Sequence, residues 1–264
     1  MLALSNVSKL FNPGTPDEKI ALMDINLKLN PGDFVTVIGS NGAGKSTLMN
    51  IISGVINPDT GTLRIEGSTI QQLSEYRRSK WIGRVFQDPM SGTAPHMTIE
   101  ENLAMAYARG KHRGLRFGVT AGKRAIFREE LQRLGIGLEN RLRAKVGMLS
   151  GGERQALSLL MATFTKPQIL LLDEHTAALD PARAELITRL TKEIVNEMKL
   201  TTLMVTHNME QAIRLGNRLI MMDQGRIILD IPEQRKKDLT VAHLLGEFEQ
   251  ISGSKLSDDR VVLG

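Results

Sequence analysis

The sequence predicts an α/β fold with a mostly parallel sheet, an antiparallel β subdomain near the N-terminus and an inserted α-helical subdomain. Three observations support this prediction. An apolar, strand-like run at 34–38 leads directly into a glycine-rich loop and a helix-like run. Strand-like and helix-like runs alternate over 153–215, which is typical of parallel strands joined by crossover helices. A segment before them has apolar residues at helical spacing only, so a helical part interrupts the α/β core.

The N-terminal part consists of short β segments separated by turns. Segments 1–7, 20–29 and 63–66 are rich in apolar residues, and turns that contain proline and glycine separate them at 12–16 and 57–61. This pattern predicts an antiparallel sheet beside the glycine-rich loop.

The helical part follows this sheet. Apolar residues recur every three to four positions in 99–107 and 123–134, so both stretches predict helices. We expect the helical subdomain to cover about 88–150. The link between its two helices carries the basic run 109–116, which indicates a solvated loop or, as a second interpretation, a contact with lipid headgroups or a membrane partner.

The remaining elements alternate in type along the chain. They are predicted helices at 153–164, 182–198 and 209–215 and predicted strands at 169–172 and 202–205. Two further strand-like runs flank Gln224-Gly225 and predict a hairpin. We therefore expect one domain over 1–250 and a loose tail over 251–264.

Composition limits the function classes. With 264 residues, of which 41% are hydrophobic, the chain can bury one large core. It has no cysteine, which excludes disulfides, thiolate metal sites and a cysteine nucleophile. It has no apolar run of about 20 residues and no secretory leader, so we expect neither a membrane span nor secretion. The charge of +5, from 34 basic and 29 acidic residues, is a mild excess that does not predict nucleic-acid binding.

The glycine-rich loop after 34–38 has the pattern of a phosphate-binding loop, which predicts a P-loop NTPase core. Its residues are Gly39, Ser40, Asn41, Gly42, Ala43, Gly44, Lys45, Ser46 and Thr47. Glycines let backbone N–H groups converge on an anion, Lys45 can reach the β- and γ-phosphates, and the Ser46 hydroxyl can bind Mg²⁺. A glycine-rich turn without a ligand is the simpler alternative. The order of strand, loop and helix favours a nucleoside triphosphate instead.

Two carboxylates follow the buried strand 169–172. Asp173 and Glu174 stand where the strands of a parallel sheet end, which is the edge at which such sheets bind their ligands. Asp173 suits a Mg²⁺ shell, and Glu174 suits a base that takes a proton from the attacking water. The alternative is a strand that ends in two solvated acids.

The segment Leu149–Gln155 predicts a helix start with a capping box formed by Ser150 and Glu153. A well-capped helix is the simpler interpretation. Gly151 and Gly152, however, leave backbone N–H groups bare at a positive helix end, which makes a second anion site that has no lysine of its own. One complete and one incomplete phosphate site in a chain predict a head-to-tail pair with two-fold symmetry, in which each protomer covers the nucleotide of the other.

Together these motifs resemble the ATP-binding subunit of ABC transporters, over roughly residues 1–245. The resemblance implies that a dimer binds ATP and Mg²⁺ and hydrolyses ATP. The residues that it assigns to the nucleotide of the partner protomer are Ser150, Gly151, Gly152 and Gln155.

The same resemblance assigns roles to two residues outside these motifs. Phe11 matches an aromatic that stacks on adenine, and Gln87 matches a glutamine that contacts Mg²⁺ and the attacking water and joins the core to the helical insert. From the residues alone, Phe11 can also be a buried aromatic at the sheet edge, and Gln87 a turn residue before Asp-Pro.

Two more residues are assigned by resemblance. Asp180 matches an aspartate that crosses the dimer interface, although Asp180-Pro181 also has the pattern of a helix cap followed by proline. His207 follows the predicted strand 202–205 and matches a histidine that contacts the γ-phosphate. A structural or exposed histidine is the alternative.

His175 departs from the family pattern, which more often has proline after the glutamate. Proline would stiffen the loop, so its absence puts the rigidity of the loop in doubt rather than hydrolysis. As a further hypothesis, a protonatable group next to Glu174 can shift the pKa of that carboxyl.

The resemblance implies a peripheral ATPase at the cytoplasmic face of the membrane. Its partners would be a second copy or a sister ATPase subunit, an integral membrane permease and, in an importer, an extracellular solute-binding protein. A separately encoded subunit favours a bacterial or archaeal importer, and the overall pattern is similar to subunits for small-solute and amino-acid uptake. The rival hypotheses are a soluble ABC-type ATPase that acts as an assembly factor and a small-molecule kinase. The kinase hypothesis does not explain the segment Leu149–Gln155.

Overall fold

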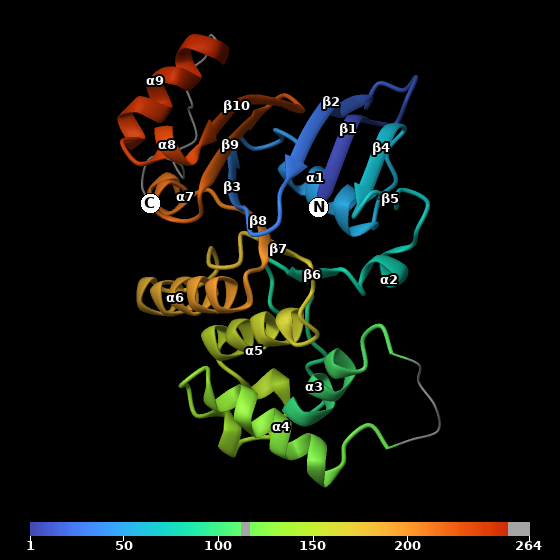
Figure 1. The fold of residues 1–264 in the computed structure, drawn as a ribbon, viewed down its shortest axis with the longest axis vertical. Coiled ribbons are helices and arrows are strands. Elements are labelled where there is room, and N and C mark those ends of the chain that lie inside the picture. The colour runs from blue at the N-terminus through green and yellow to red at the C-terminus, as the bar shows by residue number, and fades with distance from the viewer. Residues whose placement is uncertain (112–116, 253–264) are drawn as a thin grey trace. The chain divides into compact units, whose positions relative to one another are not determined.

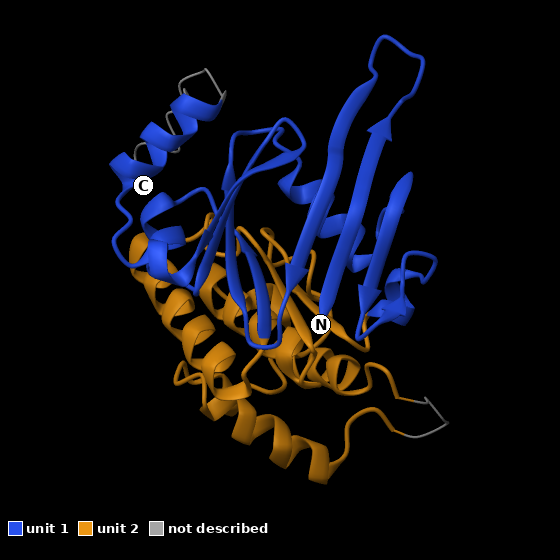
Figure 2. Ribbon diagram, turned by 45° about the horizontal axis from the view of Figure 1, so that its top comes forward, with its two compact units in different colours: residues 1–78, 201–264 blue, residues 79–200 orange. Residues whose placement is uncertain are grey.

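The computed structural model describes residues 1–111 and 117–252, in two compact units (Figure 2). The first unit comprises Met1–Arg78 and the C-terminal part of the chain from Thr201, and the second comprises Ser79–Leu200. Figure 1 labels their helices and strands. Each unit has its own core.

The first unit contains an antiparallel sheet in the order β2-β1-β4-β5. Its strands are β1 (Leu2–Phe11), β2 (Lys19–Leu29), β4 (Thr60–Ile65) and β5 (Ser68–Thr69). The antiparallel prediction is confirmed. Strand β1 continues past residue 7, where we expected it to end, because Asn6 adopts a left-handed conformation (φ 51°) and the pairing register shifts there instead of breaking.

A second sheet in this unit has strand order β10-β9-β3-β8. Its strands are β3 (Phe34–Gly39), β8 (Thr201–Val205), β9 (Arg218–Asp223) and β10 (Arg226–Pro232). Strand β3 is parallel to both β8 and β9, and its residues 34–38 are all buried, as expected for a central parallel strand. The predicted hairpin at Gln224-Gly225 is confirmed, and both turn residues have positive φ (45° and 77°).

Helices complete the first unit. They are α1 (Lys45–Ser53), α2 (Glu75–Arg78), α7 (Met209–Arg214), α8 (Glu233–Lys236) and α9 (Val241–Ser252). The sequence analysis missed α9, whose Leu244 and Phe248 are buried in a cluster with Ile38 and Met221. The tail expected over 251–264 is wrong for its first two residues, because α9 continues to Ser252, and residues 253–264 lie outside the described residues.

The second unit pairs two parallel strands with a set of helices. Its elements are β6 (Ile82–Val85), α3 (Ile99–Tyr107), α4 (Ala121–Gln132), the short 3₁₀ turns η1 (Leu138–Asn140) and η2 (Val146–Met148), α5 (Gly151–Thr163), β7 (Ile169–Asp173) and α6 (Pro181–Met198). The predicted helices 99–107 and 123–134 correspond to α3 and α4. Edge-to-face contacts among Tyr107, Phe127 and Phe164, with ring centroids 5.6–6.2 Å apart, join α3, α4 and the end of α5.

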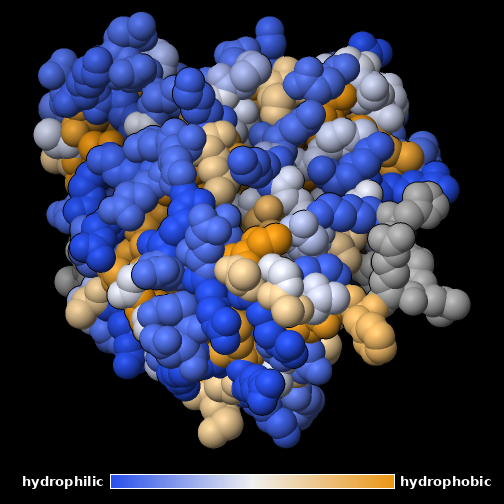
Figure 3. All heavy atoms as spheres, turned by 60° about the horizontal axis from the view of Figure 1, so that its bottom comes forward, coloured by the Kyte–Doolittle hydropathy of each residue, from blue (hydrophilic) through white to orange (hydrophobic). Residues whose placement is uncertain are grey.

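The predicted fold class is confirmed. Parallel pairing predominates around β3 in the first unit and between β6 and β7 in the second, and both the antiparallel sheet and the helical insert are present. On the face drawn in Figure 3, polar residues predominate and apolar residues form small separate patches. No helix within 1–111 and 117–252 is long and apolar enough to cross a membrane. Of the basic run 109–116, residues 112–116 lie outside the described residues.

Lys236 on α8 is a buried cation in the first unit, with 4% of its surface exposed. Its ammonium donates to the carbonyls of Leu215 and Gly216 and lies 3.4 Å from the Thr36 hydroxyl of β3. Burial lowers the pKa of Lys236 to about 8. The group therefore links the helical layer to the strand that carries the glycine-rich loop.

We expect the stability of the protein to rise between about pH 8 and pH 10.5 through Lys236. In this window the unfolded chain binds the proton more strongly than the folded chain, so the free energy of unfolding increases with pH, by roughly 3 kcal/mol at most. Urea unfolding at several pH values should show a smaller rise in Lys236→Met than in the parent. The neighbouring, exposed Lys237→Met is the control, and equal slopes in the two variants would contradict this account.

Candidate functional site

The glycine-rich loop lies between β3 and α1 and approaches neighbouring backbone closely. Gly39 (φ 150°) and Gly44 (φ 100°) both have positive φ. A Cβ on Gly39 would lie 2.0 Å from the Met222 carbonyl oxygen, and a Cβ on Gly44 would lie 2.4 Å from that of Ala21. Only glycine fits at these two positions, because the obstacle is rigid backbone.

Lys45 places a cation inside this loop. Its side chain is almost fully buried, and Nζ donates to the carbonyl oxygens of Gly39 (2.7 Å) and Ser40 (2.9 Å). The hairpin turn also holds the loop, since the Gly225 N–H donates to the Ala43 carbonyl (3.1 Å). An anion that enters the loop therefore meets an ammonium group that is already in position.

The other loop residues differ in their exposure to solvent. The Ser40 hydroxyl donates to Asp223 at the end of β9 (2.8 Å), whereas Asn41, Gly42 and Ser46 are exposed. The strand, loop and helix that we predicted are thus present, with an exposed hydroxyl on the first turn of α1.

Strand pairing brings His207 to the same sheet edge as this loop. Val37 of β3 pairs with Val205 of β8, and Gly39 and His207 each follow two residues later on parallel strands. The turn after β8 is fixed by the Asn208 side chain, which accepts from the Gln211 N–H at the start of α7 (2.7 Å). His207 is half-buried beside the loop edge.

Phe11 ends strand β1 and is half-buried rather than fully buried. The Lys9 ammonium lies 5.6 Å from its ring centroid. The ring keeps an accessible surface, as stacking on a base requires, but base stacking by Phe11 stays a prediction.

In the second unit, the parallel pair β6 and β7 brings Gln87 and the two acids to one edge. Val85 pairs with Leu172, so Gln87 and Glu174 both lie two residues beyond the same register position. Gln87 is exposed, and Glu174 has a left-handed backbone (φ 44°), an uncommon conformation for this residue type. The sheet edge thus gathers an amide and two carboxyl groups.

Asp173 is mostly buried and forms an ion pair. Its Oδ2 accepts from the Arg84 guanidinium (2.8 Å), and both side chains are largely buried. The sequence analysis missed Arg84, although a cation in the middle of an otherwise apolar strand next to Gln87 was a usable signal. Asp173 therefore has a counter-ion within the chain.

His175 corrects one hypothesis. It is fully buried, and its Nε2 lies 2.9 Å from the Thr191 hydroxyl, which itself donates to the Ile187 carbonyl (2.8 Å). Nε2 is therefore the donor, and burial lowers the pKa of His175 to about 4. The imidazole is neutral at neutral pH, so the expected effect of its charge on Glu174 is absent there, and the ring ties the loop to α6 instead.

Asp180 and Ser150 both cap helices, as we predicted. The Asp180 carboxylate accepts from the Arg183 N–H (3.1 Å) at the start of α6. Ser150 and Glu153 form a reciprocal capping box at the start of α5, in which each side chain accepts from the backbone N–H of the other (3.3 and 2.8 Å). Ser150 and Asp180 therefore both lie at the start of a helix, where backbone N–H groups attract anions.

The other residues of this helix start differ in exposure. Gly151 is exposed, but Gly152 is buried, and a Cβ there would lie 3.0 Å from the Arg183 side chain. Gln155 is fully buried and donates to the Phe86 carbonyl (3.3 Å), one residue before Gln87. This contact gives Gln155 a structural task that we did not expect, and its contact with a nucleotide stays a prediction.

A model of the ABC transporter family matches residues 22–177 of this chain. The match contains the phosphate loop, Gln87, the capped start of α5 and the two acids at the end of β7. The chain belongs to the ABC transporter family. It is an ATP-binding ATPase subunit with the cassette fold of that family.

Relatives of this ABC ATPase are named as ATP-binding proteins of transport systems. The chain is 43% identical to a tyrosine transport ATP-binding protein of Clostridioides difficile, over 94% of this chain and 99% of that protein. It is 34% identical to an energy-coupling factor transporter ATP-binding protein of Caldanaerobacter subterraneus, over 86% of this chain and 78% of that protein. Among solved structures, it is similar to a dimeric post-hydrolysis state of the ATP-binding cassette MJ0796 bound to ADP and Pi, with a TM-score of 0.76, 31% identity, and coverage of 88% and 99%.

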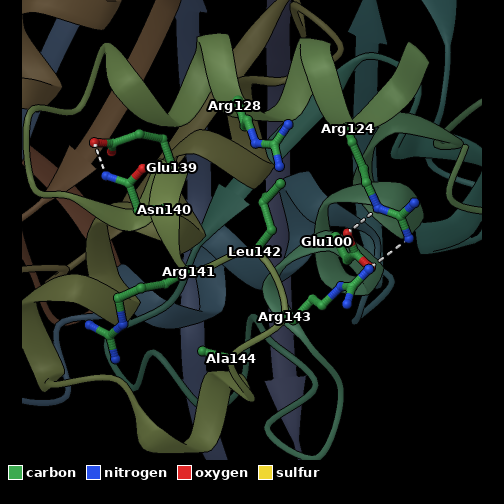
Figure 4. A pocket seen from close by; sticks show the side chains of 9 residues that line it. All are labelled: Glu100, Arg124, Arg128, Glu139, Asn140, Arg141, Leu142, Arg143 and Ala144. Atoms are coloured by element: carbon green, nitrogen blue, oxygen red, sulfur yellow. Dashed lines mark hydrogen bonds and ion pairs between the residues drawn. The ribbon is translucent and has the colours of Figure 1, made fainter. Parts of the chain in front are cut away.

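An ionic network supports the start of α5 in this ABC ATPase. A pocket in the second unit has a volume of about 420 Å³. In this pocket Arg124 and Arg143 extend toward Glu100 at the start of α3 (Figure 4). Arg124 binds Glu100 through two hydrogen bonds (2.7 and 3.1 Å), which lower the pKa of that carboxyl. On the same loop as Arg143, Arg141 binds Glu153 of the capping box (2.8 Å).

Backbone hydrogen bonds bind this loop to the segment that follows Gln87. The N–H groups of Ile99 and Glu100 donate to the carbonyls of Ala144 and Leu142, and the Val146 N–H donates to the Met97 carbonyl, all at 3.0 Å. Burial by itself would raise the pKa of Glu153, but the Ser150 N–H and Arg141 hold it below its usual value. The pocket therefore joins α3 to the capping box.

We expect Arg141→Gln to loosen the first turn of α5. It removes the partner of Glu153 and should lower stability by about 0.5–1 kcal/mol, because both groups are partly exposed. Amide exchange of the first turn of α5 and the urea midpoint would measure the effect. Arg128→Gln is the matched control, since Arg128 lines the same pocket and makes no side-chain ion pair with the described residues. Equal effects in the two variants would contradict the link.

Proposed function

We propose that this chain pairs head to tail with a second copy, or with a sister ATPase subunit, around two Mg·ATP molecules. The observation that carries this proposal is the asymmetry between two anion sites. The loop at Gly39–Thr47 encloses a lysine, whereas the capped start of α5 offers helix N–H groups and no lysine. ATP held by the first site of one protomer would be completed by the second site of its mate.

The nucleotide contacts follow from the accessible groups. We assign the phosphates to 39–47 and to Ser150 and Gly151 of the mate, and adenine to Phe11. ABC cassettes form dimers, and the dimeric structure neighbour was solved with ADP and Pi, which supports the pairing. Asp180 would contact the mate across the interface, because it is exposed at the start of α6.

Mg²⁺ would be held by the Ser46 hydroxyl, the Gln87 amide oxygen and the Asp173 carboxylate. These are hard oxygen donors with a single carboxylate, a set that suits Mg²⁺ when phosphate oxygens complete its shell. When bound, the ion neutralises negative charge that develops on the phosphates. The protein residues hold and orient the nucleotide around it.

Glu174 would accept the proton of the attacking water. The carboxyl lies at the edge shared with Gln87, which would orient that water, and the left-handed backbone at Glu174 is part of a turn tied to α6 through His175. His207 would contact the γ-phosphate from the edge of β8. Loss of that phosphate removes a contact shared by both protomers and would let the pair open.

The work of the dimer would be transport through a separate membrane permease. ABC cassettes work with permease components, and the names of relatives support import: tyrosine transport, and spermidine/putrescine import in a protein of Lawsonia intracellularis that is 33% identical over 97% of this chain and 66% of its own length. We infer a peripheral subunit at the cytoplasmic face that serves a small-solute importer with an extracellular solute-binding protein. The ATPase domain would cover 1–250, with the helical part at about 88–150 facing the permease. The assembly-factor alternative has no support from these names.

Glu174→Gln should keep ATP binding and slow turnover by about 100-fold or more, because the ligands remain while the base is lost. Phosphate release would measure the turnover rate, and calorimetry would measure the affinity for ATP. Light scattering should show ATP-dependent dimers in this variant. The exposed Glu193→Gln on α6 is the control. Turnover near the parent rate, or a monomer at saturating ATP, would refute the assignment.

Lys45→Ala should weaken ATP binding itself by about tenfold or more, since a charge-assisted contact to phosphate is lost. Equilibrium binding of ATP would measure the change, with the exposed Lys192→Ala on α6 as the control. Unchanged affinity in Lys45→Ala would count against the loop as the nucleotide site.

A further inference from the structure

We propose that Arg84 is the resident counter-ion of Asp173 and competes for that carboxylate with the metal ion of the metal–nucleotide complex. This inference rests on the proposed role of Asp173 as a Mg²⁺ ligand. It assigns to Arg84, which lies outside the phosphate loop, the capped start of α5 and the strand-end acids, control over how strongly the site holds its metal.

The two residues lie on neighbouring strands of the same unit. Arg84 pairs with Leu171 in the parallel register of β6 and β7, so Asp173 follows two residues further along the partner strand. The Arg84 Nη2 lies 2.8 Å from Asp173 Oδ2, and the two side chains expose 11% and 13% of their surface. This is a short and largely desolvated contact, unlike the exposed ion pairs on the helices.

A second contact fixes the guanidinium independently of Asp173. The central carbon of Arg84 lies 4.7 Å from the centroid of the Phe86 ring. Phe86 is itself held, because its carbonyl accepts from the buried Gln155 side chain (3.3 Å). The contact with the Phe86 ring can therefore hold the Arg84 guanidinium when the Asp173 carboxylate binds another cation.

The Asp173 carboxylate needs a cationic partner both when the nucleotide is bound and when it is absent. An ionised group at a largely buried strand end is costly when it stands alone, so some cation must compensate Asp173 before the nucleotide arrives and after it leaves. Arg84 supplies that cation from within the chain. A metal ion that binds Asp173 must compete with Arg84 for the same carboxylate.

Competition with Arg84 should lower the affinity of Asp173 for the metal ion. A positive charge within hydrogen-bond distance of a metal ligand lowers the affinity of that ligand for a dication. Arg84 should therefore weaken the metal-dependent part of nucleotide binding and ease release of the spent metal–nucleotide complex. A merely structural ion pair would change stability without changing this coupling between metal and nucleotide.

The test uses the full chain, Mn²⁺ and AMP-PNP, an ATP analogue that is not hydrolysed. The measured quantity is the ratio of AMP-PNP affinities with and without Mn²⁺, obtained by calorimetry, with Mn²⁺ binding followed separately by electron paramagnetic resonance. Arg84→Met removes the charge at similar length and should raise this ratio about tenfold over the parent. Arg84→Lys keeps the charge and should stay within about threefold of the parent.

Further variants complete the design. Arg64→Met on β4 removes an exposed arginine and should behave as the parent, which controls for net charge. When Asp173→Asn is present, adding Arg84→Met should no longer change the ratio, because Arg84 acts through that carboxylate. If Arg84→Met does not fold, Arg84→Gln takes its place and should shift the ratio in the same direction.

The outcomes are distinguishable. An unchanged or lower ratio in the neutral Arg84 variants, with a parent that does gain affinity from Mn²⁺, overturns this inference and leaves the proposed function intact. The same holds if Arg84→Lys behaves like Arg84→Met. A parent that gains nothing from Mn²⁺ removes the proposed metal site and this inference together.

Discussion

The phosphate loop depends on a steric constraint: the two glycines at its ends lie against the backbone of neighbouring strands. Gly39 faces the carbonyl of Met222 on β9, and Gly44 faces that of Ala21 on β2. No side chain fits at either position, so the loop packs directly against backbone at both glycines. The cation of Lys45 is held inside this frame by two loop carbonyls. The first unit is arranged around that frame, with β3 buried between β8 and β9 and the hairpin turn bonded to the loop.

The second unit is organised by connections between short motifs rather than by a single loop. Arg141 ties the pocket loop to the capping box of α5, and Gln155 ties the same helix to the residue before Gln87. Backbone hydrogen bonds join that loop to the start of α3. These contacts connect the start of α3, the start of α5 and the residue before Gln87 within the second unit.

Several ionisable groups of the site are compensated by neighbouring groups of the chain. Lys45 has carbonyl partners, Asp173 has Arg84, Glu153 has Arg141, and His175 is neutral because it is buried. An ATPase that binds and releases a highly charged ligand benefits from such local compensation. Each group keeps a defined position when the ligand is gone, and the cost of burial is met within the chain.

The sequence by itself determined the fold class, most of the longer elements and the motifs. Patterns that are local in the chain carry this information: apolar spacing predicted α3 and α4, glycine and lysine spacing predicted the phosphate loop, and Ser150 with Glu153 predicted the capping box. Only the tertiary structure decided the partners of side chains that lie far apart in the sequence. The Arg84–Asp173 pair spans 89 positions, Gln155 reaches back 69 positions to Phe86, and α9 is fixed by burial of Leu244 and Phe248 against other elements. The neutral state of His175 likewise follows from its surroundings, because a pKa depends on solvation and neighbours that no local pattern encodes.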